Sequence, residues 1–178
     1  HSLVSGGDDK SLRAKVVSAR SVHVADATAV HDLVLSPNGT QYFTGGTDRQ
    51  LKQWTLAGKP VKTLATLPAP IRHVSISPDG KTVAAGGDPL ASSKEVRAFR
   101  VADGKQLFTS AMPAGVTALA LAGNSRLAVT DSGKAIHWFQ ASDGRLLETT
   151  ITPAVTTDLA AHSNGRTLYL ASADNNVW

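Results

Sequence analysis

The feature that most constrains this chain is an internal repeat. Residues 30–39 and 71–80 carry apolar and turn-forming residues at matching places. Two further copies begin at Val116 and Thr156, so the successive offsets are 41, 45 and 40 positions. A period of about 40–45 residues is typical of a propeller blade, which is a sheet of four strands. The repeat therefore predicts an all-β chain of the β-propeller type, a ring or an arc of four-stranded antiparallel blades.

Each repeat begins with the pattern of a strand followed by a tight turn. Apolar residues recur at every second position, at 33 and 35 and again at 74 and 76, which is the period of a strand with one buried face. The motifs Ser-Pro-Asn-Gly and Ser-Pro-Asp-Gly then end at Gly39 and Gly80. In such turns Pro presets φ at the first corner, and Gly supplies a positive φ. We expect Gly39 and Gly80 to be structural residues with positive φ.

Large rings mark the third strand of each repeat. Trp54, Phe99 and Trp138 each close a short strand-like segment, and Trp178 stands at the end of the chain. Aromatic side chains bury a large area and stabilise packed sheets. We predict that Trp54, Phe99 and Trp138 are structural residues buried between adjacent blades.

Three of these motifs together resemble the WD-repeat β-propeller family over nearly the whole chain. They are the Ser-Pro-Asn/Asp-Gly hairpin, the turns in which two small residues are followed by an Asp (Gly45-Gly46 with Asp48, Gly86-Gly87 with Asp88), and the third-strand ring. The resemblance implies a propeller that presents a surface to other proteins.

The sequence also departs from the family pattern. The Gly-His pair before the inner strand is missing, and Thr55, Arg100 and Phe139 stand where the family has an Asp after the Trp. In the family the turn Asp, the His and the Trp share a hydrogen-bonded network, which cannot be complete here. We expect Asp48 and Asp88 to cap their own turns instead.

The repeat divides the chain into blades within one propeller-type domain, residues 1–178. We expect complete blades at 29–69, 70–114 and 115–154, and partial blades at 1–28 and 155–178. Rings usually hold about four to eight blades, and the two partial blades do not add up to one regular blade. The missing blades are therefore expected from a second copy of this chain or from another part of a longer chain.

Composition argues against several classes of function. The chain has no Cys, and its 18 Lys and Arg are spread among 14 Asp and Glu without a block of like charge, so we expect no nucleic-acid partner. The longest apolar stretches fall far below the roughly 20 residues of a membrane-spanning helix. No His spacing of a metal site and no Gly-x-Ser-x-Gly elbow occurs. We expect a protein that is not an enzyme and has no catalytic residue, metal or cofactor, while its compartment stays undetermined.

Loops and polar strand positions are the remaining candidates for function. The second repeat inserts Pro89-Leu90-Ala91-Ser92-Ser93 into a turn that is tight elsewhere, and loops on a rigid scaffold often carry binding residues. A tolerated surface insertion is an equal alternative. His31-Asp32 and Arg72-His73 fall at equivalent points of the inner strand, where a solvated or channel-facing role is the other interpretation. The candidate protein-interaction surface consists of His31, Asp48, Arg72, His73, Asp88, Pro89, Leu90 and Lys94.

Two other classes of function stay open. One is a propeller that binds a small ligand or a carbohydrate, and the other is an enzyme with a site in the central channel. A cluster of exposed aromatic side chains on one face or a deep polar pocket on the axis would favour these alternatives, whereas a flat face of mixed charge favours a protein partner.

Overall fold

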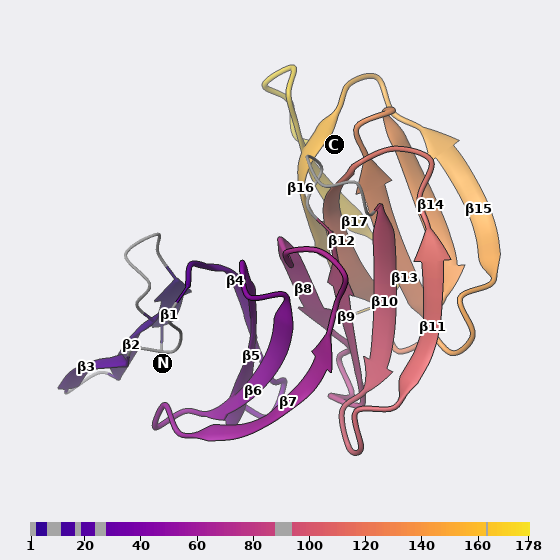
Figure 1. Ribbon diagram of the computed structural model, residues 1–178. Coiled ribbons are helices and arrows are strands. Elements are labelled where there is room, and N and C mark those ends of the chain that lie inside the picture. Colours follow the sequence, from indigo (N-terminus) through magenta and orange to yellow (C-terminus); the bar gives the residue numbers. More distant parts are fainter. Residues whose placement is uncertain (1–2, 7–11, 17–18, 24–27, 88–93, 163) are drawn as a thin grey trace.

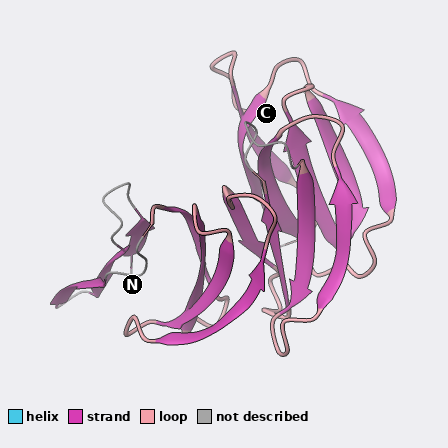
Figure 2. Cartoon of the chain, in the orientation of Figure 1, coloured by secondary structure: helices cyan, strands magenta, loops and turns pink. Residues whose placement is uncertain are grey.

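The computed structural model describes residues 3–6, 12–16, 19–23, 28–87, 94–162 and 164–178. Every regular element in this part of the chain is a strand, and it contains no helix (Figure 2). Consecutive strands pair antiparallel within each sheet, and the sheets stand side by side in an arc (Figure 1). The prediction of an all-β propeller or propeller arc is confirmed.

Three sheets have four strands each, ordered from the inside of the arc outward. The first contains β4 (Val30–Leu35), β5 (Gln41–Gly46), β6 (Gln50–Thr55) and β7 (Pro60–Thr66). The second contains β8 (His73–Ile76), β9 (Thr82–Gly86), β10 (Glu95–Arg100) and β11 (Gln106–Ala111). The third contains β12 (Val116–Ala122), β13 (Arg126–Asp131), β14 (Ala135–Gln140) and β15 (Leu146–Ile151). These are the β4–β7, β8–β11 and β12–β15 blades.

A smaller sheet lies at each end of the arc. The opening sheet contains β1 (Leu3–Gly6), β2 (Leu12–Val16) and β3 (Ala19–His23), with β1 next to β4 (Figure 1). The closing sheet contains β16 (Thr156–Ala161) and β17 (Leu168–Ser172), and Val177 adds a single bridge to Ala171. The inner strands β4, β8, β12 and β16 are successive neighbours, so they form the inner wall of the arc.

The hairpin between the first two strands has the predicted geometry. Gly39 and Gly80 have φ of 66° and 70°, in the left-handed region that favours glycine. In the first turn, the Ser36 hydroxyl donates to the Gln41 carbonyl and accepts from the Gln41 N–H, at 2.8 and 3.0 Å. The prediction of positive φ at both glycines is confirmed.

Apolar side chains between successive blades form the core. The interface between the first two blades is built around Phe43, Ile71 and Val83, all completely buried. The next interface contains Phe108 and Phe139, with ring centroids 6.5 Å apart. The last interface, between the β12–β15 blade and the closing sheet, is made mainly of alanines with Ile136 and Leu159.

The third-strand aromatic positions require one correction. Strand pairing shifts between Gln53 and Trp54, between Ala98 and Phe99, and between Trp138 and Phe139, which makes Phe139 the equivalent of Trp54 and Phe99. The side chains of Trp54, Phe99 and Phe139 are buried, with 7%, 3% and 5% of their surface exposed.

Trp138 therefore does not occupy the predicted position. It lies on the opposite face of β14, partly exposed, with the Arg126 guanidinium carbon 5.7 Å from its ring centroid. Adjacent strand residues point to opposite faces, so only one ring of the pair Trp138-Phe139 can face the preceding blade. In this structure that ring is Phe139.

Candidate interaction surface

His31 and Arg72 connect two neighbouring blades at one end of their sheets. They occupy equivalent positions of the repeat, His31 within β4 and Arg72 just before β8. Arg72 Nη1 lies 3.2 Å from His31 Nδ1. The other ring nitrogen, Nε2, lies 2.9 Å from the Thr47 hydroxyl. Because a guanidinium can only donate, Nδ1 must accept here, which leaves Nε2 to carry the proton and donate to Thr47. The imidazole thus ties the inner strand of one blade to its own turn and to the next blade.

Asp48 lies in that same turn and is held by two contacts. Its Oδ1 accepts the N–H of Gln50 at 3.0 Å, which is the side-chain cap of its own turn that the sequence predicts. Its Oδ2 lies 2.6 Å from Lys52 Nζ. Asp48 is therefore held through both carboxylate oxygens, with only 13% of its side chain exposed.

In each complete blade, the residue two positions before the buried third-strand ring lies beside an acidic side chain. Lys52 is that residue in the β4–β7 blade. Its equivalents are Arg97, which pairs with Glu95 at 2.7 Å, and His137, whose Nε2 lies 2.9 Å from Asp131 Oδ2. The His137 pair is buried, and Asp131 also accepts two main-chain N–H groups through Oδ1. Lys52 and His137 thus connect their third strands to an acid beside the preceding turn, whereas Arg97 pairs within β10, and the sequence reasoning missed these pairs.

A second network inside the β4–β7 blade was also missed. The indole N–H of Trp54 donates to the Thr44 hydroxyl at 2.9 Å, with both groups buried. A buried Trp needs a partner for its N–H, so a hydroxyl on the adjacent strand was the available signal. This bond retains part of the family network although the family's His is missing.

His73, which directly follows Arg72 in the chain, lies on the inner wall of the arc. It lines a hollow of about 590 Å³ together with Asp32 and Asp158, one from each of three inner strands. Burial lowers the pKa of His73, the charge of Asp158 raises it and that of Arg72 lowers it. Since neighbouring strand residues face opposite ways, His73 belongs to the inner wall and not to the surface around His31.

Asp32 is held by main-chain donors on this wall. Its Oδ1 accepts the N–H of Leu33 at 2.8 Å, and its Oδ2 accepts the N–H of Val74, in the next blade, at 2.7 Å. Burial raises the pKa of Asp32 to about 6, the two N–H groups lower it, and the charge of Asp158 raises it further. Oδ2 therefore joins the two blades, while Oδ1 holds the carboxylate against its own strand.

The predicted surface residues divide into three groups. His31 and Arg72 contact each other at one end of their sheets, and Asp48 directly follows Thr47, the other partner of His31. Lys94 is exposed just before β10, at the end of its blade that corresponds to the Asp48 turn. Asp88, Pro89 and Leu90 lie outside the described residues.

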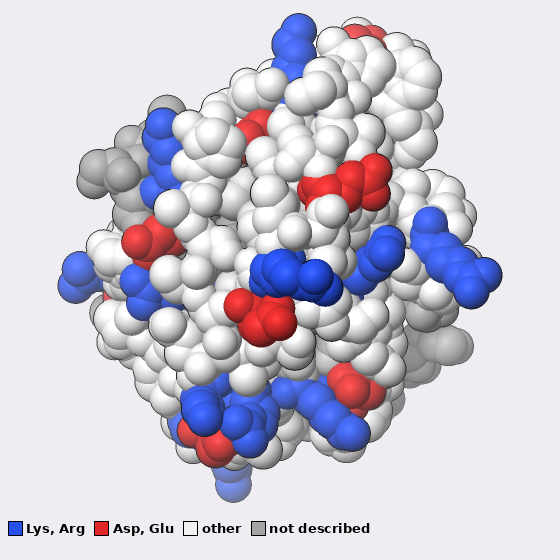
Figure 3. Space-filling model, turned by 90° about the vertical axis from the view of Figure 1, so that its right-hand side faces the viewer, with Lys and Arg blue, Asp and Glu red and all other residues white. Residues whose placement is uncertain are grey.

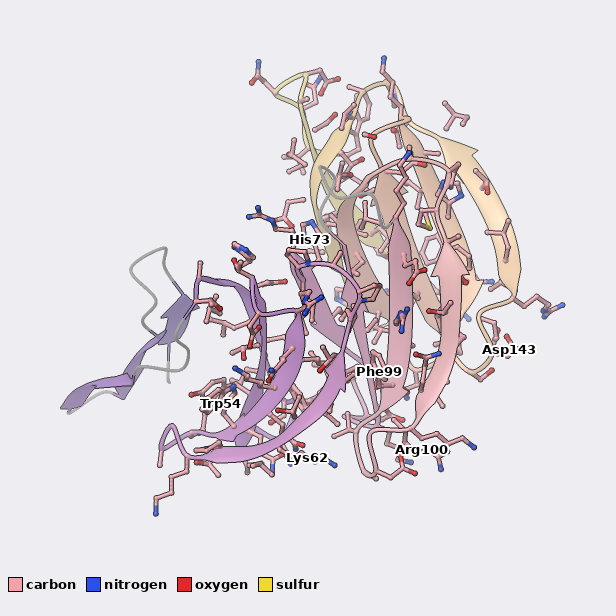
Figure 4. All side chains as sticks on the ribbon, viewed as in Figure 1. Trp54, Lys62, His73, Phe99, Arg100 and Asp143 are labelled. Carbon is pink, nitrogen blue, oxygen red and sulfur yellow. The ribbon has the colours of Figure 1, made fainter. Side chains whose placement is uncertain are left out.

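The opposite end of the sheets carries a separate polar bridge. Lys62 Nζ donates to the carbonyls of Val101 and Ala102 in the next blade, at 2.9 and 2.8 Å. Figure 4 shows Lys62 and Arg100 at the end of the sheets away from His73. On the face shown in Figure 3, Lys and Arg side chains are interspersed with Asp and Glu rather than gathered into one basic patch.

The described part of the chain offers neither a metal cluster nor a membrane-spanning helix. Within the residues that the structure describes, no group of three or more His, Asp or Glu side chains could hold a metal ion. No helix there is long and apolar enough to cross a membrane.

Comparison with known proteins identifies the repeats. Residues 17–55 and 58–91 match the family model described as WD domain, G-beta repeat. The resemblance to the WD-repeat β-propeller family is therefore confirmed, and the chain carries WD-type repeats. No curated protein matches the chain.

Solved structures extend the likeness to the whole chain. A chain in the crystal structure of the mitotic checkpoint complex has a TM-score of 0.84 and 19% sequence identity. The match covers 99% of this chain but only 57% of that chain. Matches extend to 1599 solved chains, so the propeller fold is established while the fold alone selects no particular function.

Proposed function

We propose that this chain is a non-catalytic protein-interaction scaffold whose WD-type blades hold a polar surface for a protein partner. The observation that carries the proposal is the bridge from Thr47 through His31 to Arg72, which fixes charged and polar groups across two blades. Arg is enriched among the residues that dominate binding energy at protein interfaces. The similar chain of the mitotic checkpoint complex, a part of a protein assembly, supports a protein as the partner.

The bridge suits recognition because it reduces the cost of binding. Ordering a flexible side chain at an interface costs about 0.5–1.5 kcal/mol, and a side chain already held in place avoids part of that cost. Arg72 and Asp48 are both held by neighbours in this structure. The mixed charge of this end, with His31, Arg72, Asp48 and the exposed Lys94, fits a partner surface that itself carries both signs of charge.

Protein partners also include whatever completes the ring. A second copy of this chain and another part of a longer chain are the two sources that we consider. Light scattering of the purified chain at micromolar concentration distinguishes them, since only the first gives a dimer.

The test of the interaction surface is affinity capture with matched variants. The purified chain, Arg72→Ala and Asp48→Ala would each be used to capture partners, followed by quantitative mass spectrometry. Arg100→Ala, at the opposite end of the sheets, is the control. We expect a defined set of captured proteins to fall about tenfold or more for Arg72→Ala, as for an interface hot spot, and to stay unchanged for the control. Equal capture by all variants, or loss with Arg100→Ala alone, would refute the assignment.

A further inference from the structure

A threonine stands at the same place on the outermost strand of each complete blade. All three threonine side chains are exposed, and each lies opposite the third-strand residue that comes two positions before the buried ring. The pairs are Lys52 with Thr63, Arg97 with Thr109 and His137 with Thr149. The same hydroxyl can therefore be compared beside three different side chains.

The side chain beside Thr149 differs from the other two in that it can take up a proton. Lysine and arginine side chains are cationic and can only donate hydrogen bonds. His137 Nδ1, in contrast, lies 3.2 Å from Thr149 Oγ1. A neutral imidazole has one nitrogen that accepts a hydrogen bond and can act as a base. The other contact of the ring determines which nitrogen this is.

Asp131 provides that other contact. Its Oδ2 lies 2.9 Å from His137 Nε2, and its Oδ1 accepts the N–H groups of Gly133 and Ala135 at 2.9 and 3.0 Å. Because the carboxylate accepts, Nε2 carries the ring proton, and Nδ1 accepts from the Thr149 hydroxyl. Only 2% of the Asp131 side chain and 9% of the His137 side chain are exposed. A buried acid thus orients a base, and the base contacts an exposed hydroxyl, which is the arrangement of an activated nucleophile.

A largely apolar hollow lies beside these contacts. It has a volume of about 400 Å³, and it is formed between the end of β11 and the facing side of β14 and β15. Its lining includes His137 and Thr149 together with Met112, Phe139 and Leu146. Apolar hollows with a few well-placed polar groups are typical of small-molecule sites. A short hydrocarbon chain joined to a carbonyl group at Thr149 has room there.

We propose that Thr149 is an acylation site, at which an activated ester or thioester transfers one acyl group to the threonine hydroxyl. Thr149 is the nucleophile, His137 is the general base, and Asp131 is a positioning residue that acts through His137. The site includes none of the residues assigned to the interaction surface around His31, so each of the two proposals can fail alone.

The reaction balances without oxidation or reduction. The Thr149 oxygen forms a bond to the carbonyl carbon of the donor, and its proton passes to His137 Nδ1. The bond from that carbon to the leaving oxygen or sulfur then breaks, and the leaving atom takes the proton from Nδ1. The products are an O-acyl threonine and a free alcohol or thiol, and His137 is neutral again.

Labelling with para-nitrophenyl butyrate tests the proposal. The purified chain is incubated with this ester, and peptide mass spectrometry follows the butyryl group on each residue with time. We expect Thr149 to be labelled about 100-fold faster than Thr109, because a positioned general base contributes at least about that factor. Equal rates at the two threonines, or label found on lysines and absent from Thr149, would overturn the proposal. This comparison uses the natural chain and does not depend on how a variant folds.

A pair of matched variants tests the nucleophile. Thr149→Val removes the hydroxyl and keeps the branched shape of an exposed strand residue, and Thr109→Val makes the same change in the preceding blade. We expect the rapid release of nitrophenolate to disappear in Thr149→Val and to stay unchanged in Thr109→Val. Rapid release that persists in Thr149→Val would show that another group reacts.

Asp131→Asn tests the positioning residue. The amide oxygen can still accept from Gly133 and Ala135, but the amide NH₂ donates to His137 Nε2, so the ring proton moves to Nδ1 and the base is lost. We expect the labelling of Thr149 to fall to the rate of Thr109. In alkaline solution the rate should become independent of pH for the natural chain, because His137 is then neutral, and should keep rising with hydroxide concentration for Asp131→Asn. Identical pH profiles would contradict the role of Asp131, since a purely structural residue would leave the profile unchanged.

Discussion

Replacement of Gly144 by Ala tests how closely the blades stack. Gly144 lies in the turn after β14 with φ of 73°, and it touches the preceding blade. A Cβ built on it would lie 2.5 Å from two carbons of the Phe108 ring. Phe108 has only 6% of its surface exposed and stacks on Phe139, so it has little room to move.

Two costs add in this variant. An L-residue other than Gly in the left-handed region costs roughly 1–2 kcal/mol. Overpacking a filled interface by a methyl group costs about 1–3 kcal/mol more. We expect Gly144→Ala to lower the free energy of unfolding by about 2–5 kcal/mol.

Gly39→Ala separates the two costs. Gly39 has a similar φ of 66°, but a Cβ there would meet no atom within 4 Å. Only the backbone cost of roughly 1–2 kcal/mol remains. Urea denaturation followed by far-ultraviolet circular dichroism measures both variants. Losses of equal size would refute the contact between the 142–145 turn and Phe108.

Three further predictions follow from single contacts. Trp54→Phe keeps a ring but removes the indole N–H, which leaves the buried Thr44 hydroxyl without that donor. We expect the free energy of unfolding in urea to fall by about 1–2 kcal/mol, and a fall below about 0.3 kcal/mol would contradict the bond. Phe139→Ala should cost about 3–5 kcal/mol, as expected for a buried ring, and a negligible loss in the same assay would return the third-strand position to Trp138. Because the pKa of Asp32 is raised from 3.8 to about 6 on folding, its contribution to stability is complete below pH 3.8 and is lost as the pH rises through about 6. The stability of the natural chain relative to Asp32→Asn should therefore fall over that range, and a constant difference would contradict the raised pKa.

The repeat in the sequence was sufficient to predict the blades and their turns. Gly39 and Gly80 could be placed because hairpin chemistry acts within a few residues, and a local rule needs no knowledge of the neighbouring blade. Trp138 was misplaced for the opposite reason. Two adjacent rings satisfy the same local pattern, and only packing against the preceding blade determines that Phe139 faces inward.

The candidate surface was predictable in part. The equivalence of His31 and Arg72 could be seen in the aligned repeats, but their contact depends on how the blades stack. The role of Asp32 depends in the same way on the N–H of Val74, which lies in another blade. Alternation along the strand could have assigned His73 to the inner wall, because it directly follows Arg72.

The strictly consecutive pairing of strands also shapes how this protein folds. Each four-stranded sheet is built from one continuous stretch of chain, so the contacts within it have short sequence separation and little loop-closure entropy to overcome. Among the described strands, the longer-range contacts join neighbouring sheets, as in a one-dimensional array. The interface with Phe108 and Phe139 buries a large apolar cluster, so we expect structure formed there to spread to the neighbouring sheets. A nascent chain of this kind can gain structure one blade at a time as it leaves the ribosome.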